Sequence, residues 1–137
     1  MKDLNQQYLG QEGYDLIGYA YEAHRELGGG LSEEIYQESF ELELKRQEVP
    51  AEPKAELAVF YKGHQLKKTY IPDLLVHHEI VTELKAVKAL TNEHEQQLLN
   101  YMHITRKAIG YLINFGPPSL EWKRFILKQY IPEEYRF

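Results

Sequence analysis

Three charged residues stand inside apolar stretches in the second half of the sequence. Asp73 interrupts the mainly apolar residues 70–76, and Glu83 and Lys85 interrupt a second apolar run that begins at Ile80. Removing ionised groups from water costs several kcal/mol unless they are paired or bind an ion. A lone Glu-x-Lys is usually a partly exposed ion pair, but a second acid in the preceding run favours a chemical site.

The relative position of the two acids depends on the turn between the runs. A three-residue turn, His77 to Glu79, places Asp73 opposite Glu83 on one face of an antiparallel pair, whereas a two-residue turn pairs Asp73 with Thr82. Along an extended strand Glu83 and Lys85 share a face. We predict the odd-length turn, because two facing carboxylates can share a divalent cation.

Two further polar residues are expected on helices. Helical geometry places Glu33 within about 60° of the apolar residues Tyr36, Phe40 and Leu44, so its carboxylate is expected to point at the sheet. The alternative is an acid that only stabilises the helix start. Gln97 lies at the edge of the apolar face of a later helix, where it could orient the lysine, a water or a phosphate oxygen.

The histidines show no zinc-like spacing. His24 falls among the apolar positions of the first helix and is predicted to be a hydrogen-bonded core residue, while His94 is expected to cap a helix or support the site. The sequence has no cysteine, which excludes disulfides, zinc ribbons and thiolate chemistry.

Length and charge limit the class of protein. The 137 residues, 43% hydrophobic and 27% charged, predict one domain over residues 1–137, with a core of about 14–115 and a C-terminal extension of 116–137. The formal charge is −5, with five basic and thirteen acidic residues in 1–60 against eleven basic and eight acidic in 61–137. This balance argues against nucleic-acid binding by bulk charge, and any anionic partner is expected beside the second half.

Periodicity predicts an α+β protein. Helices are expected over 14–27, 31–48 and 92–105, a three-stranded meander over 57–61, 66–76 and 80–87, and a buried strand over 108–115. Residues 120–128 are ambiguous. The order α-α-β-β-β-α-β predicts a mixed sheet flanked by helices. No apolar leader or membrane-length apolar run is visible, so we expect a cytoplasmic protein.

Basic residues of the second half could line a nucleic-acid path, although scattered lysines are usually a solvated surface. They are Lys62, Lys67, Lys68, Lys88, Arg106, Lys107, Lys123, Arg124 and Lys128.

Several blocks resemble a known superfamily. Pro72-Asp73 followed by Glu83-Leu84-Lys85 is similar to the P-D…(D/E)-x-K signature of metal-dependent nucleases, and Gly30-Leu31-Ser32-Glu33-Glu34-Ile35-Tyr36 resembles the hallmark of the small bacterial GxxExxY family within it. The stretches 24–28, 94–101 and 112–115 resemble further blocks of that family, so the match runs from about 14 to 115. Gly29 departs from the proline that the family often has there.

The resemblance implies roles for individual residues. Asp73 and Glu83 would hold the metal, with the Leu84 carbonyl as a further ligand and Glu33 reaching it directly or through water. Lys85 would help to deprotonate or position the attacking water and would neutralise transition-state charge, and Gln97 would be the polar partner of the site on the helix. His24, His94 and Tyr36 would support the site. Mg²⁺ is the expected ion, and Mn²⁺ suits the same oxygen ligands.

The resemblance therefore implies a restriction-endonuclease-like fold and hydrolysis of phosphodiester bonds, with DNA as the expected substrate. A catalytically inactive binding module of the same fold is the alternative. A homodimer is also expected if both strands of a duplex are cut, with residues 130–137 as a candidate contact.

Overall fold

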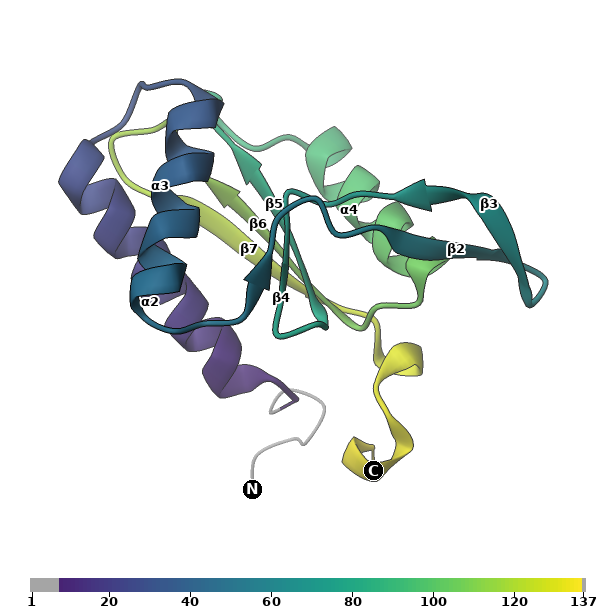
Figure 1. Cartoon of the computed structure of the whole chain (residues 1–137). Coiled ribbons are helices and arrows are strands. Elements are labelled where there is room, and N and C mark those ends of the chain that lie inside the picture. The colour runs from purple at the N-terminus through teal and green to yellow at the C-terminus, as the bar shows by residue number, and fades with distance from the viewer. Residues whose placement is uncertain (1–7, 137) are drawn as a thin grey trace.

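The computed structural model describes residues 8–136, in which a central sheet separates two layers (Figure 1). Positions 1–7, where a leader was considered, and Phe137, the last residue of the candidate dimer contact, lie outside the described residues. The helices are α2 (Gly10–Leu27), α3 (Glu33–Arg46) and α4 (Asn92–Thr105), with short 3-10 turns at η1 (Lys128–Tyr130) and η2 (Glu133–Tyr135). The strands are β1 (Ala51–Glu52), β2 (Leu57–Tyr61), β3 (His64–Tyr70), β4 (Leu74–Val76), β5 (Ile80–Lys85), β6 (Ile109–Asn114) and β7 (Glu121–Ile126).

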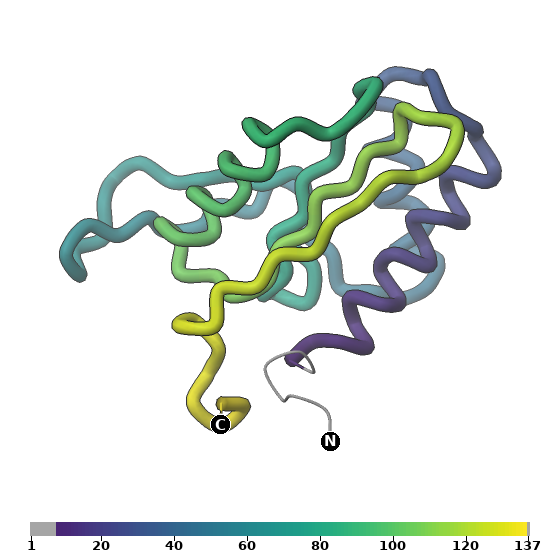
Figure 2. Tube along the Cα trace, turned by 180° about the vertical axis from the view of Figure 1, so that it is seen from behind, coloured from purple at the N-terminus to yellow at the C-terminus, as the bar shows by residue number. Residues whose placement is uncertain are grey.

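The five-stranded sheet is mixed, which confirms the predicted fold class. Its order is β1-β4-β5-β6-β7. Strand β5 pairs parallel to β6, and the other neighbours are antiparallel. The parallel pair follows from the helix between its strands, because a parallel connection must cross back over the sheet. The ambiguous residues 120–128 supply the edge strand β7, as Figure 2 shows from behind.

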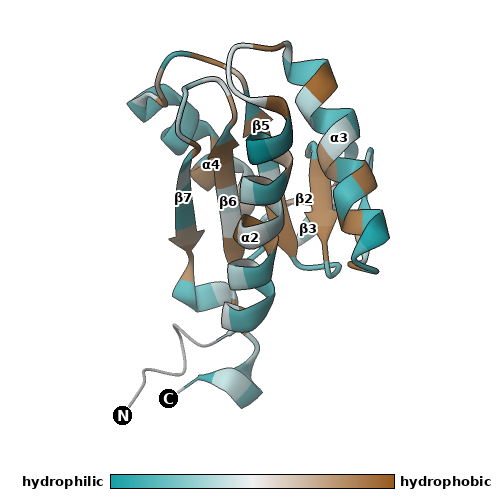
Figure 3. Cartoon of the chain, turned by 90° about the vertical axis from the view of Figure 1, so that its left-hand side faces the viewer, coloured by the Kyte–Doolittle hydropathy of each residue, from teal (hydrophilic) through white to brown (hydrophobic). Residues whose placement is uncertain are grey.

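The two faces of the sheet bury separate apolar clusters. Helices α2 and α3 cover one face, where Tyr36, Phe40 and Leu44 are fully buried against strand residues such as Leu84. Helix α4 covers the other face, where Leu98 and Val81 belong to the second cluster. Each large apolar side chain buried in this way contributes about 1.5–3 kcal/mol. In Figure 3 the outer surfaces of α2 and α3 are mostly hydrophilic, as their position requires.

Local signals explain where the helices end. Helix α2 ends at Gly28, whose φ of 77° favours glycine. The Ser32 hydroxyl accepts the Ile35 N–H at 3.4 Å and so caps α3. The boundaries of all three helices lie within four residues of the predicted ones. No helix in the described part of the chain is long and apolar enough to cross a membrane.

The predicted three-stranded meander is wrong. Residues 66–76 form no single strand: β3 ends at Tyr70 and β4 begins at Leu74. Pro72 lies in the break, and proline offers no N–H to a strand partner. Strands β2 and β3 therefore form a separate two-stranded sheet that projects beside α4, while β1 pairs with β4 (Figure 1).

Candidate active site

Asp73 and Glu83 meet at the end of the β4–β5 hairpin. The register pairs Leu74 with Thr82 and Val76 with Ile80, which leaves the three-residue turn that was predicted. Continuing this register by one residue places Asp73 opposite Glu83. The two acids thus lie on one side of the sheet, as expected from the odd-length turn.

Main-chain amides hold both carboxylates in place. The Leu84 N–H donates to Asp73 Oδ2 at 2.7 Å, and the Asp73 N–H donates to Glu83 Oε1 at 3.4 Å. Because β4 begins only at Leu74, the Leu84 amide of β5 donates to the Asp73 carboxylate and not to a main-chain carbonyl of a paired strand. The pair is therefore positioned by backbone, which fixes it more firmly than side-chain contacts alone.

The proximity of the two acids makes the negative charge on Glu83 unfavourable. Burial and then the charge of Asp73 raise the pKa of Glu83 to about 7, against the lowering effect of hydrogen bonds from Tyr70 and from the Asp73 amide. A carboxyl group with this pKa is partly protonated at neutral pH. A cation between the carboxylates would reverse this effect, because it favours the ionised form.

Tyr70 belongs to the site, although no sequence pattern predicted it as a site residue. Its hydroxyl donates a hydrogen bond to Glu83 Oε1, and its ring stacks on Tyr101 of α4 with centroids 3.9 Å apart. Burial and the nearby Glu83 raise the pKa of the phenol, which keeps it a donor. Tyr70 was interpreted as part of a continuous strand, and only the break at Pro72 turns β3 toward Glu83.

Gln97 and Tyr101 extend this contact along α4. The Gln97 side-chain amide donates to the Tyr101 hydroxyl at 3.2 Å. Gln97 is exposed and has no hydrogen bond to Lys85 within the described residues. Its observed partner is thus a tyrosine that backs the site, while its amide remains open to an incoming polar group.

Lys85 stands two residues after Glu83 on the α4 side of the sheet. Val81 on the same face belongs to the α4 cluster, whereas Leu84 packs toward α2 and α3. Lys85 is partly buried. Among residues 8–136 no carboxylate oxygen lies within 4.0 Å of its ammonium group. Its charge is therefore available to an anionic group at the site.

The Leu84 carbonyl has the direction that a further ligand requires. The Lys85 carbonyl accepts the Phe115 N–H at 2.8 Å and so points toward β6. Main-chain groups of successive strand residues point to opposite sides. The Leu84 carbonyl therefore points away from β6, to the side where its own amide meets Asp73.

Glu33 reaches the site region but is not buried. It is the first residue of α3 and is exposed, so it does not share the burial of Tyr36, although it borders the same surface hollow as Asp73. The physical reason is its position in the first turn, beyond the apolar contacts of the helix. Desolvation and then Asp73 raise the pKa of Glu33, while Lys85 and His94 lower it. The carboxylate thus interacts with the site through its electric field.

Tyr36 supports the loop that precedes α3, and His24 supports the loop that follows β6. The Tyr36 hydroxyl donates to the Gly28 carbonyl at 2.6 Å and accepts the Leu31 N–H at 3.0 Å. His24 is buried and donates from Nε2 to the Pro117 carbonyl at 2.9 Å. The expectation of a hydrogen-bonded core histidine is confirmed. Both side chains make hydrogen bonds to loops, and within the described residues neither makes one to Asp73 or Glu83.

His94 caps α4. Its Nδ1 accepts the Thr91 N–H at 3.1 Å, and its own N–H donates to Thr91 Oγ1 at 3.3 Å. This reciprocal pair is a capping box that satisfies two main-chain donors at the start of α4. The cap fixes the helix that carries Gln97 and Tyr101.

The donor set suits a hard divalent cation that keeps part of its water shell. Within residues 8–136 no three His, Asp or Glu side chains converge on one point where a metal ion could bind. Two carboxylates and a main-chain carbonyl remain, all of them oxygen donors. Mg²⁺ commonly binds through one or two carboxylates with several waters, so these residues fit it.

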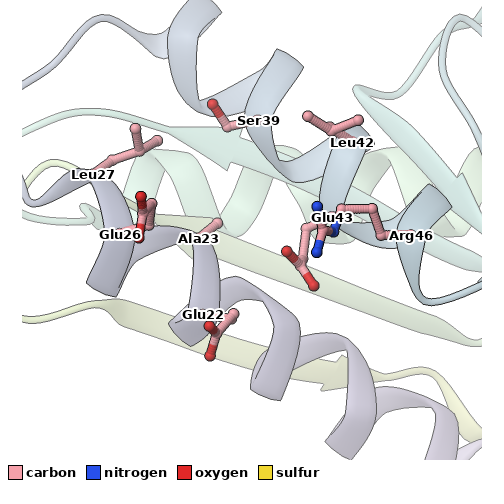
Figure 4. A pocket seen from close by; sticks show the side chains of 8 residues that line it. All are labelled: Glu22, Ala23, Glu26, Leu27, Ser39, Leu42, Glu43 and Arg46. Carbon is pink, nitrogen blue, oxygen red and sulfur yellow. The ribbon is translucent and has the colours of Figure 1, made fainter.

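Of the surface hollows that border α3, two differ in their relation to the acidic pair. One, of about 440 Å³, separates α2 from α3 and contains no residue of the acidic pair (Figure 4). The other, of about 860 Å³, runs past Asp73 and is here called the acidic groove. Its lining is Glu33, Glu34, Gln37, Glu38, Glu41, Pro53, Lys54, Ile71, Pro72 and Asp73. With five carboxylates and one lysine, the acidic groove repels anions.

Comparison with known proteins supplies a family and a fold. The model of the PD-(D/E)XK nuclease superfamily matches residues 10–125. The crystal structure of SSO0001 is similar to this chain with a TM-score of 0.53 and 21% sequence identity, over 68% of this chain and 48% of that one. The chain thus spans about half the length of that protein, and the likeness concerns the fold, which is restriction-endonuclease-like. No curated protein matches the sequence.

Proposed function

The chain belongs to the PD-(D/E)XK nuclease superfamily, and from this membership and the paired acids we propose that it is a Mg²⁺-dependent nuclease that hydrolyses DNA. The observation that carries the proposal is the facing pair Asp73 and Glu83, held by backbone amides beside an unpaired Lys85. A fold without metal-dependent chemistry has no need for facing carboxylates that raise the pKa of Glu83.

The residues divide into ligands and charge-stabilising groups. Asp73, Glu83 and the Leu84 carbonyl would hold the ion, and Glu33 would contact it through water. A bound Mg²⁺ lowers the pKa of the attacking water and neutralises charge on the phosphate. Mn²⁺ suits the same oxygen ligands.

Lys85 is proposed to be a catalytic residue. Its ammonium group projects from the strand that carries Glu83, where it would position the attacking water and stabilise negative charge in the transition state. Gln97 would donate from its exposed amide to a phosphate oxygen. Tyr70 would orient Glu83 through their hydrogen bond.

We further propose that the chain belongs to the GxxExxY family. The motif from Gly30 to Tyr36 has a physical basis in the loop before α3. Gly30 has a φ of 86° and donates to the Gly116 carbonyl at 3.0 Å, while Tyr36 holds the same loop from the next turn. The motif includes Glu33 at the start of α3, where the charge of Asp73 acts on its carboxylate. A single domain over 1–137, a homodimer and a cytoplasmic location stay predictions.

The test compares metal binding and cleavage in four proteins. Wild type, Asp73→Asn and Glu83→Gln are titrated with Mg²⁺ by calorimetry and thermal shift, with Asp15→Asn on the exposed side of α2 as the matched control. We expect wild type and the control to gain stability with Mg²⁺ and to cleave DNA, and both site variants to lose these responses. If the wild-type protein shows no thermal shift with metal and no cleavage under Mg²⁺ or Mn²⁺, the nuclease proposal is contradicted and the catalytically inactive binding module remains.

A further inference from the structure

The hairpin of β2 and β3 is a basic segment of an acidic protein. Residues 57–70, here called the basic arm, contain Lys62, Lys67 and Lys68 and no Asp or Glu. The arm therefore carries a formal charge of +3, in a chain whose net charge is −5. In the sequence these lysines belong to a scattered set of basic residues, and in the structure they lie together on one projecting hairpin.

The charges of the arm are exposed and unpaired. Every residue from Tyr61 to Lys68 is exposed. Within the described residues, no ion pair involves a lysine of the arm. A solvated surface usually mixes both signs of charge. An exposed strand of one sign is instead suited to an anionic partner.

The arm is rigidly attached beside the acidic pair. Lys62 and Gly63 both have positive φ, which gives the tight two-residue turn that matches strand twist. At the base of the arm the Tyr70 hydroxyl donates to Glu83, and near the turn the guanidinium of Arg106 lies 4.8 Å from the centre of the Phe60 ring. Any molecule lying along the arm is therefore directed to the acidic pair.

The surface on the α3 side of the acidic pair is unfavourable for a nucleic-acid backbone. The acidic groove along α3 carries five carboxylates and one lysine, so an anion approaching there is repelled. Figures 1 and 2 show the arm on the side of the sheet away from α2 and α3, next to α4. The charge distribution thus leaves the arm side as the path to Asp73 and Glu83.

We propose that the basic arm binds duplex DNA by lying in its major groove, with its lysines on the backbone phosphates. The proposal rests on the proposed nuclease function and names the form of its substrate. The seven residues of β3 extend about 20 Å, and the major groove of B-form DNA admits a two-stranded ribbon. The deep, narrow major groove of A-form RNA does not.

The test is a binding experiment without cleavage. Full-length protein in EDTA is titrated against labelled 24-base-pair DNA, the corresponding single strand and an RNA duplex, with fluorescence anisotropy as the readout. The arm variant is Lys62→Ala/Lys67→Ala/Lys68→Ala. The matched control, Arg25→Ala/Lys45→Ala/Arg46→Ala, removes the same charge from exposed positions on α2 and α3. Thermal unfolding checks that both variants are folded.

We expect wild type to prefer the DNA duplex. The arm variant is expected to bind it about 100-fold more weakly at about 0.1 M salt, with a salt dependence reduced by about 2 to 3 released counterions. The control should change affinity less than about fivefold. Equal losses in both variants, or equal wild-type affinity for single strands or RNA duplexes, would overturn the proposal.

Cleavage with Mg²⁺, measured separately, distinguishes the two proposals. Arm-dependent binding without cleavage by wild type supports the arm and contradicts the nuclease. Cleavage by an arm variant that binds duplex DNA as tightly as wild type supports the nuclease and contradicts the arm. Absence of DNA binding by wild type contradicts the arm directly.

Discussion

Replacing Glu83 by glutamine is expected to stabilise the metal-free protein at high pH. The folded-state pKa of Glu83 is about 7, against an ordinary value of 4.5. A carboxyl whose pKa is raised by folding contributes stability below its unfolded pKa and loses it as pH rises through the folded one. Each unit of pKa difference between the folded and unfolded states corresponds to about 1.4 kcal/mol. Between pH 4.5 and pH 7 this group therefore lowers the free energy of unfolding of the wild-type protein by about 3 kcal/mol.

The assay is urea unfolding in EDTA at pH 5 and pH 8. Glutamine keeps an acceptor oxygen for the Tyr70 hydroxyl and the Asp73 amide, so the substitution mainly removes the charge. We expect the free energy of unfolding of Glu83→Gln, relative to wild type, to be higher at pH 8 than at pH 5 by about 3 kcal/mol.

The matched control is Glu93→Gln at an exposed position in the first turn of α4. Its difference from wild type should be the same at both pH values within about 0.5 kcal/mol. A Glu83→Gln difference that is independent of pH, or that falls toward pH 8, would refute the argument that Asp73 and burial disfavour the charge.

Four further substitutions test separate parts of the site and of the fold. Lys85→Ala should reduce the cleavage rate about 100-fold or more while the Mg²⁺-dependent thermal shift remains. Tyr70→Phe keeps the aromatic ring but removes the hydrogen bond to Glu83, so calorimetry should show Mg²⁺ affinity about 10-fold lower. Gly29→Ala should lower the free energy of unfolding by about 1–3 kcal/mol, because a Cβ there would lie 2.5 Å from a backbone oxygen. Gly18→Ala, in the middle of α2 where a Cβ meets no other atom, should raise the free energy of unfolding by about 0.5–1 kcal/mol.

The hairpin that carries the acidic pair could be predicted because its geometry depends on local rules. A three-residue turn and the twofold period of a strand were enough to place Asp73 opposite Glu83. The capping role of His94 likewise follows from a neighbour three positions away. Such features need only short-range spacing and the apolar pattern of one strand or helix.

Contacts between distant segments could not be predicted in this way. Tyr70 meets Glu83 and Tyr101 only because the chain leaves the sheet at Pro72 and β3 turns toward α4. A hydrophobic pattern continues across that break, so periodicity alone favoured one long strand. For Glu33 the helical angle was suitable, but the helix begins at that residue, which leaves it exposed. Helix boundaries are the feature that periodicity determines least well.

Cleavage of plasmid DNA as a function of Mg²⁺ concentration, by wild type and Asp73→Asn side by side, tests the central claim most directly. The account predicts cleavage by wild type that rises with Mg²⁺ and stops in EDTA, and none by Asp73→Asn, with Asp15→Asn behaving like wild type. Equal cleavage by Asp73→Asn and wild type, or wild-type cleavage that persists in EDTA, would contradict a metal-dependent site built on Asp73 and Glu83.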